Sequence, residues 1–243
     1  AYSETKLSFG KTYLIPKPLD PRLITTIAPA VAKAAMESGV AKTHIDDWEA
    51  YELDLQERIG IDQRLMSRVI ARAKKEPKRV VFTEADNPKI LKAAQIMRDE
   101  KIGIPILLGN KNKIKKLILA NSLDLEEEIV IDPNEEKAKL KHFGQLLYDK
   151  RKRKGLTLYE AKKLMKDRNY FGAMMVETGE GDALISGLTK DYPRTILPSL
   201  QIIGVKKGAN KVAGMYIMNS DKGPLFFADT TVNENPSADE LVE

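Results

Sequence analysis

Ser186, Gly187 and Thr189 form the motif with the clearest chemical potential. They follow a short apolar segment, residues 183–185, and precede a helix expected over about residues 194–203. A glycine beside two hydroxyl side chains lets backbone N–H groups approach a phosphate closely, and the start of the following helix favours an anion. An ordinary strand-to-helix turn with an N-cap has the same composition. The motif therefore predicts either a phosphate site or a structural turn.

The densest group of cations is the run Lys150-Arg151-Lys152-Arg153-Lys154, which ends at Gly155. At the end of an expected helix these side chains match the negative pole of the helix dipole, so a solvated helix end explains them. Alternatively, one or two of them capture a ligand phosphate, for which arginine is preferred because its planar fork binds two oxygens. A nucleic-acid surface is the third interpretation. The run lacks the interleaved aromatic residues that stack on bases, so no nucleic-acid partner is predicted.

The rest of the sequence limits the remaining chemistry. It contains no cysteine and only two histidines, His44 and His142. Disulfides, thiolate zinc sites, iron–sulfur clusters and cysteine nucleophiles are therefore excluded, and two histidines so far apart do not predict a metal site. The segment Gly179-Glu180-Gly181 is the nearest approach to a nucleotide-binding glycine motif, and it lacks the third glycine. Anion binding and carboxylate-based or metal-independent chemistry remain.

Length and composition are those of an ordinary folded protein. Hydrophobic residues make up 42% and charged residues 31% of the 243 residues, which excludes disordered and low-complexity classes. The 40 basic and 35 acidic residues give a net charge of +5, and this mixed surface does not choose between nucleic acid and a phosphorylated cofactor. No apolar stretch is long enough for a membrane helix and no secretory signal is recognisable, so we expect a cytoplasmic protein without a membrane partner.

Apolar periodicity predicts the elements that must position these groups. Residues 1–76 are typical of helices only, over about 21–38, 46–60 and 62–76. From residue 79 onward, short apolar segments alternate with helical ones. Segments typical of strands buried on both faces are 80–82, 104–108, 129–131, 183–185, 212–218 and 225–228.

This alternation predicts an α/β fold. We expect a mostly parallel sheet with flanking helices in residues 77–243, preceded by a small helical segment in residues 1–76. Ligands bind beyond the carboxyl ends of the strands of such sheets, and hydroxyl and amide side chains dominate these ends here. A capping box from Ser237 to Glu240 starts a helix about one turn before Glu243, so we expect the chain to continue in a longer protein.

Several segments carry a resemblance to known families. Residues 9–24 (FGKTYLIPKPLDPRLI) and 28–40 (APAVAKAAMESGV) resemble the segment that ends the catalytic part of bacterial malic enzymes. From about Arg79 onward the chain is similar to the phosphate acetyl/butyryltransferase family. That similarity is carried by residues 147–157 (LYDKRKRKGLT), 169–175 (NYFGAMM), 181–187 (GDALISG) and 225–229 (LFFAD). In this order the segments resemble the hybrid malic enzymes, in which a malic module precedes a phosphotransacetylase-like domain.

The resemblance implies which sites the chain carries. The malate, divalent metal and NADP sites of the hybrids lie before Ala1, and the catalytic residues of the transferases lie after Glu243, so no catalytic residue is expected here. Arg151 matches a family arginine that contacts coenzyme A. A second such arginine is replaced by Leu197, which weakens the case for acetyl transfer, and Arg194 is the candidate to compensate. With Ser186, Gly187 and Thr189, these arginines are the expected acyl-CoA contacts.

Three functions follow as hypotheses. In the first, a degenerate transferase domain binds acetyl-CoA or a related acyl-CoA and regulates a malic module that converts malate to pyruvate with NADP, within a homo-oligomer. In the second, the complete domain still moves acetyl between coenzyme A and phosphate. In the third, the fold is a binding or structural module that only holds protomers together, and the basic run of residues 150–154 contacts other macromolecules.

Overall fold

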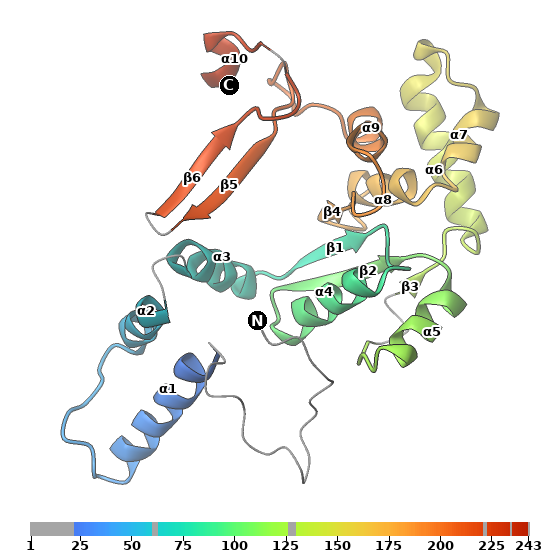
Figure 1. Ribbon diagram of the computed structural model, residues 1–243. Coiled ribbons are helices and arrows are strands. Elements are labelled where there is room, and N and C mark those ends of the chain that lie inside the picture. The colour runs from blue at the N-terminus through green and yellow to red at the C-terminus, as the bar shows by residue number, and fades with distance from the viewer. Residues whose placement is uncertain (1–21, 60–62, 126–129, 221–222, 234, 243) are drawn as a thin grey trace. The chain divides into compact units, whose positions relative to one another are not determined.

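The computed structural model describes residues 22–59, 63–125, 130–220, 223–233 and 235–242 (Figure 1). The chain divides into two compact units, residues 1–68 with 215–227 and residues 69–214 with 228–243. Each unit is described by itself. The domain boundary between residues 76 and 77 stays a prediction.

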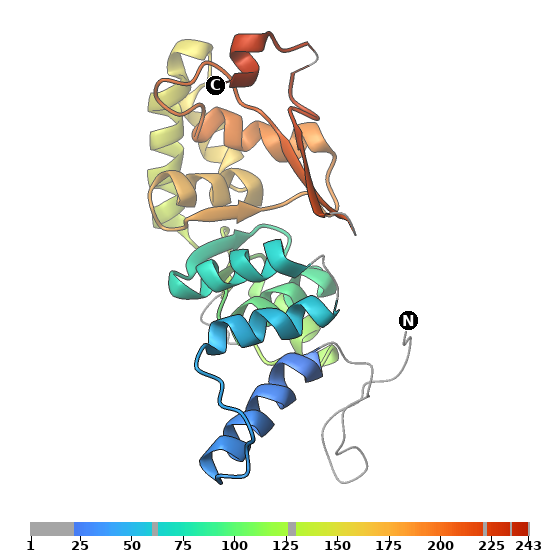
Figure 2. The same ribbon diagram turned by 90° about the vertical axis from the view of Figure 1, so that its left-hand side faces the viewer.

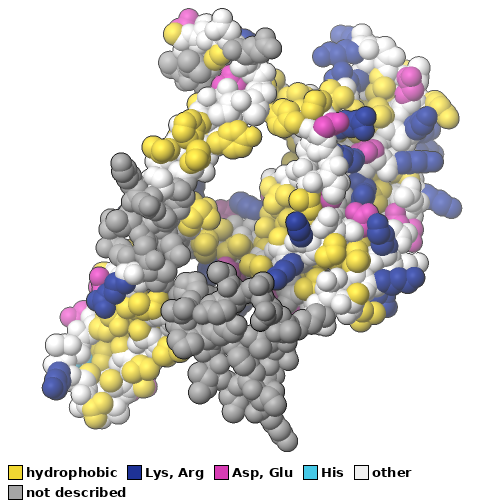
Figure 3. All heavy atoms as spheres, in the orientation of Figure 1, with side chains coloured by type: hydrophobic (Ala, Val, Ile, Leu, Met, Phe, Trp, Pro, Cys, Tyr) yellow, Lys and Arg dark blue, Asp and Glu magenta, His cyan; other side chains and the backbone are white. Residues whose placement is uncertain are grey.

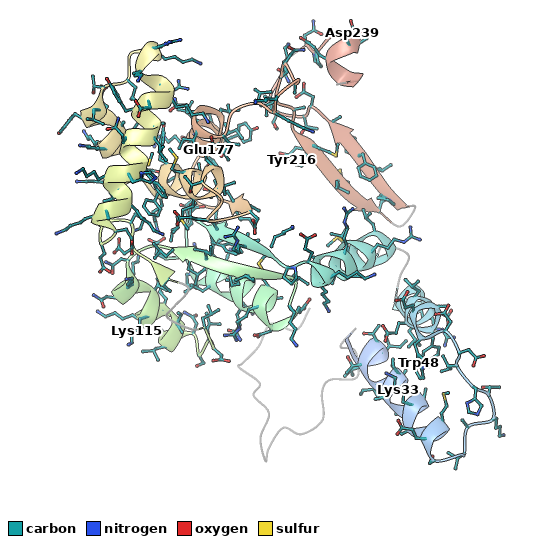
Figure 4. All side chains as sticks on the ribbon, turned by 180° about the vertical axis from the view of Figure 1, so that it is seen from behind. Lys33, Trp48, Lys115, Glu177, Tyr216 and Asp239 are labelled. Atoms are coloured by element: carbon teal, nitrogen blue, oxygen red, sulfur yellow. The ribbon has the colours of Figure 1, made fainter. Side chains whose placement is uncertain are left out.

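The three predicted N-terminal helices are confirmed as α1 (Arg22–Glu37), α2 (Trp48–Ile59) and α3 (Gln63–Lys75). The ammonium of Lys33 on α1 lies 4.9 Å from the ring centroid of Trp48 on α2, where a cation is attracted to the aromatic face (Figure 4). The ring of Tyr51 meets Trp48 edge to face at 5.9 Å. The predicted start of the first helix, at residue 21, lies outside the described residues.

The parallel sheet of the second unit confirms the predicted fold class. It contains β1 (Lys78–Phe82), β2 (Gly103–Leu108), β3 (Val130–Ile131) and β4 (Ala183–Ile185). Their order across the sheet is β3-β2-β1-β4, and every neighbouring pair is parallel. β1 is therefore central, and it pairs with a strand that follows it by about a hundred residues, Val80 lying opposite Ala183.

Helices cover both faces of this sheet (Figure 2). Val80 and Phe82 pack in one core with residues of α4 and α5, whereas Val81 packs in the other core with residues of α6 to α9. This alternation follows from the two-residue period of a strand. The flanking helices are α4 (Pro88–Asp99), α5 (Lys111–Ala120), α6 (Lys137–Arg151), α7 (Leu158–Leu164), α8 (Arg168–Glu177) and α9 (Tyr192–Ile202), and a short 3-10 helix, η2 (Lys152–Lys154), follows α6.

Side-chain caps mark the start of three helices of the second unit. The Oδ1 of Asn87 accepts a hydrogen bond from the backbone N–H of Lys89, and that of Asn110 accepts one from Lys113. Thr157 and Glu160 form a capping box at the start of α7. Each cap satisfies backbone N–H groups that have no partner inside the helix, which fixes where the helix begins.

The predicted burial of the later strands is wrong. β4 has two exposed residues, and β5 (Met215–Ser220) and β6 (Gly223–Ala228) pair with each other in a separate sheet. Apolar side chains of this hairpin are exposed, with 55% of Tyr216 and 59% of Phe226 accessible (Figure 3). A continuous apolar segment indicates a strand but does not identify the sheet that the strand joins. After the hairpin, the predicted Ser237–Glu240 capping box opens α10 (Ala238–Val242).

The described helices include none with both the length and the apolar character needed to cross a bilayer.

An ion pair between Arg79 and Asp182 joins the start of β1 to the residue before β4. Arg79 donates to the Asp182 carboxylate through its backbone N–H at 2.8 Å, its Nη2 at 2.8 Å and its Nε at 3.1 Å. These bonds hold the pKa of Asp182 at about 2, below the ordinary value of 3.8, and the side-chain bond from Arg79 has the largest effect.

We therefore expect Asp182 to titrate near pH 2 in a carboxyl-carbon NMR titration, and Arg79→Ala to raise that midpoint toward 3.8. The rise should be incomplete because the backbone N–H of residue 79 still donates. Since the folded-state pKa lies below the unfolded value, the pair stabilises the fold above pH 3.8 and the contribution is lost as the pH falls through about 2. A midpoint near 3.8 in the unmodified chain would contradict the contact.

Candidate functional site

A pocket of about 600 Å³ lies where the C-terminal end of α6, η2 and one side of α7 meet α8 and α9. This volume is within the range of small-molecule sites. Leu156 and Leu164 give the wall an apolar part. Its polar and charged lining comes from Arg151, Lys154, Glu160, Lys163, Asp167, Tyr170 and Gln201.

The turn after α6 places the cations beside this pocket. Arg151 is the last residue of α6, and Gly155 then reverses the chain with a φ of 88°, a left-handed conformation that favours glycine. Its N–H donates to the carbonyl of Lys152. Thr157 begins α7 two residues later, so Lys163 on that helix comes to line the same pocket as Arg151 and Lys154.

Helical geometry divides the cation run into two groups. Lys150 pairs with Glu177 at 2.6 Å, and Lys152 pairs with Asp149 at 3.0 Å. These two lysines match the structural interpretation of the run. In contrast, the side chains of Arg151 and Lys154 line the pocket and form no ion pair or hydrogen bond within the part of the chain that the structure describes. The same holds for Lys163 of the pocket.

The two carboxylates of the pocket are occupied by other groups. Glu160 accepts from the backbone N–H of Thr157 at 2.9 Å and from its hydroxyl at 2.7 Å. These bonds, with a smaller contribution from the positive charge of Lys163, hold the pKa of Glu160 below its ordinary value. Asp167 accepts from the N–H of Asn169 at 2.8 Å and from the ammonium of Lys190 at 2.9 Å. The three pocket cations therefore keep their charge available for an anionic ligand.

A neutral hydrogen-bonding pair forms another part of the wall. The hydroxyl of Tyr170 on α8 donates to Oε1 of Gln201 on α9 at 2.8 Å. Burial, with a smaller contribution from the negative charge of Asp167, raises the pKa of Tyr170, so the hydroxyl stays protonated at neutral pH. The pocket thus combines cations, apolar surface and a neutral polar pair, which suits a ligand with an anionic part and a less polar part.

The predicted Ser186-Gly187-x-Thr189 turn lies directly after β4, apart from the pocket lining. Its N–H groups already have an anionic partner, the carboxylate of Glu84, which follows β1. The Oε2 of Glu84 accepts from the N–H of Gly187 at 2.8 Å and of Leu188 at 2.7 Å, and its Oε1 accepts from the N–H of Thr189 at 2.9 Å. The hydroxyl of Thr189 also donates to Oε1. A ligand phosphate that used these groups would have to displace the carboxylate.

Ser186 belongs to a partly buried chain of hydrogen bonds. The hydroxyl of Thr83 donates to the Ser186 hydroxyl at 2.8 Å, and Ser186 donates to Oδ1 of Asn169 at 3.0 Å. Thr83 and Asn169 are fully buried. The Nδ2 of Asn169 has no hydrogen-bond partner, the one such buried side-chain atom among the described residues.

The structure does not bring Arg194 together with Arg151. The side chain of Arg194 is 81% exposed, its Nε lies 3.4 Å from Oδ2 of Asp191, and it is not part of the pocket lining. Leu197, at the expected position of a second arginine, is 45% exposed. Ligand contacts of Arg194, Ser186, Gly187 and Thr189 stay predictions.

Sequence reasoning missed four residues that shape this region: Glu84, Lys163, Tyr170 and Gln201. Glu84 follows β1 and faces the glycine turn that follows the neighbouring strand β4. A carboxylate after one strand and a Gly-Thr turn after another strand of the same sheet is the signal that could have identified Glu84. The other three lie on helix faces, and their spacing in the sequence carries no comparable signal.

Comparisons with known proteins agree with this fold. Residues 64–243 match the family model described as phosphate acetyl/butaryl transferase. A phosphotransacetylase from Streptococcus pyogenes superimposes with a TM-score of 0.67 and 28% identity, over 73% of this chain and 54% of that one. The phosphate acetyltransferase of Thermoanaerobacterium thermosaccharolyticum is 36% identical over 73% of this chain and 55% of its own length.

The full length of the chain matches a second group of relatives. The NADP-dependent malic enzyme of Escherichia coli is 39% identical over 100% of this chain and 32% of its own length. That of Salmonella typhimurium is 38% identical with the same coverage. The chain therefore spans about a third of the malic enzymes and about half of the transferases that it matches. Both resemblances noted in the sequence are confirmed.

Proposed function

Because the chain belongs to the phosphate acetyl/butaryl transferase family, we propose that the pocket beside Arg151 binds acetyl-CoA or a related acyl-CoA as a regulatory ligand. The observation that carries the proposal is the set of three pocket cations, Arg151, Lys154 and Lys163, none of which forms an ion pair with a carboxylate among the described residues. Coenzyme A is an anion with several phosphate oxygens, and cations that need not first leave a salt bridge bind it at lower cost.

The regulatory part of the proposal is supported by the match to malic enzymes. The chain is similar over its whole length to a segment of these enzymes, so we propose that it couples acyl-CoA binding to oxidative decarboxylation of malate with NADP and a divalent metal, bound by a separate malic module. Such coupling requires the ligand to favour one of two arrangements of a larger assembly. A homo-oligomer would provide that assembly. Light scattering tests this by measuring the mass of the polypeptide that carries both modules, which should be a multiple of the mass of one chain.

Two measurements test the proposal. Calorimetric titration of this chain with acetyl-CoA should show saturable binding. In the polypeptide that carries both modules, acetyl-CoA should inhibit malate oxidation, whereas the isolated malic module should not respond. Equal inhibition of both proteins would reject regulation through this domain, and an absence of binding to the chain and to the longer polypeptide would reject the pocket.

Acetyl transfer between coenzyme A and phosphate is the alternative, favoured by the identity of 36% to a phosphate acetyltransferase. Leu197 in place of a coenzyme-contacting arginine argues against it. An arsenolysis assay on the longer polypeptide decides between the two, because release of coenzyme A above background supports transfer and a rate at background rejects it.

A further inference from the structure

We propose that Glu84 is a resident anion that determines where the phosphates of a ligand bind. Its carboxylate occupies the anion-binding groups of the turn at residues 187–189, which leaves the Arg151 pocket as the place for phosphate, and it positions the start of α9. The identification of the ligand as an acyl-CoA rests on the proposed function, whereas the role of Glu84 does not depend on it.

The geometry at Glu84 is that of a filled anion site. Three consecutive N–H groups and one hydroxyl converge on its two oxygens, with N···O distances of 2.7 to 2.9 Å. Gly187 has a φ of 106°, and such a left-handed residue turns neighbouring N–H groups toward a common point. Successive N–H groups arranged in this way bind phosphate and carboxylate groups in many proteins.

The carboxylate is compensated by the turn alone. Glu84 is 3% exposed, and no Lys or Arg forms an ion pair with it in the part of the chain that the structure describes. A buried carboxylate without hydrogen bonds would be strongly destabilising. Burial by itself raises the pKa of Glu84, but the bonds from Thr189, Leu188 and Gly187 outweigh it and the pKa is lowered, so the group is charged at neutral pH.

A charged Glu84 excludes a second anion from the turn. The carboxylate already takes all four donors of the turn, so a phosphate there would find none of them free. It would also be repelled by the negative charge of Glu84. Among the described residues, no carboxylate forms a hydrogen bond or ion pair with Arg151, Lys154 or Lys163. A ligand with phosphate groups is therefore directed to the pocket and away from the turn.

The same contacts make Glu84 a positioning residue. The turn leads into α9, whose Gln201 accepts the Tyr170 hydroxyl in the pocket wall. Thr83, beside Glu84, holds Ser186 at the other end of the turn. Two adjacent residues after β1 thus fix the path of the chain between β4 and α9.

The discriminating experiment follows the backbone amides of Gly187, Leu188 and Thr189 by NMR while inorganic phosphate is added. In the unmodified chain these amides should not respond. In Glu84→Ala the vacated turn should bind phosphate, or formate, which is the size of the missing carboxylate, with saturable shifts of all three amides. The unfolding midpoint temperature of this variant should also rise with formate beyond the effect of equal chloride.

Glu84→Gln is the matched control. The glutamine amide fills the same space as the carboxylate, so formate has no room to bind. Its NH₂ group is a donor and faces the N–H donors of the turn, so hydrogen bonds are lost. It should be destabilised without rescue. Saturable phosphate shifts of the turn in the unmodified chain, or equal formate responses of Glu84→Ala and Glu84→Gln, would overturn the proposal. If Glu84→Ala does not fold, its refolding yield with and without formate gives the same test.

The outcome is separable from the proposed function, because the amide shifts and the formate rescue are measured without acyl-CoA. If acyl-CoA does not bind the unmodified chain, the pocket assignment fails while the amide shifts still report on Glu84. If acyl-CoA binds, Glu84→Ala should weaken that binding, and formate should restore it. Weakened binding that formate does not restore, in a variant whose turn binds formate, would overturn the positioning role.

Discussion

Titration of Arg151→Ala with acetyl-CoA is expected to give an affinity about 10- to 100-fold lower than that of the unmodified chain. The reason is the loss of one charge-assisted hydrogen bond to phosphate, worth about 1.5 to 3 kcal/mol. Arg151 lines the pocket and has no internal carboxylate partner among the described residues, so its removal leaves no buried charge behind and folding should be unaffected. Circular dichroism checks the fold, and calorimetry measures the affinity.

Arg153→Ala is the matched control for this experiment. It removes the same charge from the same run, but Arg153 is exposed and is not part of the pocket lining. Its affinity should change by less than about threefold, as expected for a screened surface charge. Equal losses in both variants would mean that the run attracts the ligand by net charge alone, and an unchanged affinity in Arg151→Ala would remove this residue from the site.

The second large effect concerns the core that supports the pocket. Phe171→Ala is expected to lower the free energy of unfolding of the second unit by about 3 to 5 kcal/mol, because it removes a buried ring and leaves a cavity. Phe171 is fully buried on α8, and its ring centroid lies 5.1 Å from that of Phe143 on α6. The substitution therefore loosens the contact between two helices that line the ligand site.

Urea unfolding followed by far-ultraviolet circular dichroism measures this loss. Tryptophan fluorescence would not report it, since the single tryptophan, Trp48, belongs to the first unit. Tyr159→Ala serves as the control because Tyr159 is 77% exposed, and its effect should stay within about 0.5 kcal/mol. A loss below about 1 kcal/mol for Phe171→Ala would show that the core can collapse around the missing ring.

The arrangement of helices and parallel strands could be predicted because local signals agree. Asn87, Asn110 and Thr157 each begin a helix through a side-chain cap, and short apolar segments separate these helices. The burial of β5 and β6 could not be predicted in this way. An apolar segment indicates a strand whose side chains are favourably buried, but which surface buries them depends on tertiary contacts.

The candidate site was predicted in part. The cation run indicated an arginine but left Arg151 and Arg153 equivalent, and only the resemblance singled out Arg151. The pocket beside it agrees with a ligand contact, which stays a prediction. The turn at Ser186 was expected to offer N–H groups to an anion, and they do donate to one. That anion is Glu84, which lies 103 residues before Gly187, and no local pattern connects two residues so far apart.

The separation between Glu84 and its turn also sets an order of events in biosynthesis. A ribosome adds about 5 to 20 residues per second, so roughly 5 to 20 s pass between synthesis of β1 and synthesis of β4. Throughout this interval the edge of β1 that later meets β4 is unpaired in the nascent chain. We expect ribosome-associated chaperones to engage the polypeptide in this window, and silent codon changes that slow translation between the two strands to lower the yield of folded protein.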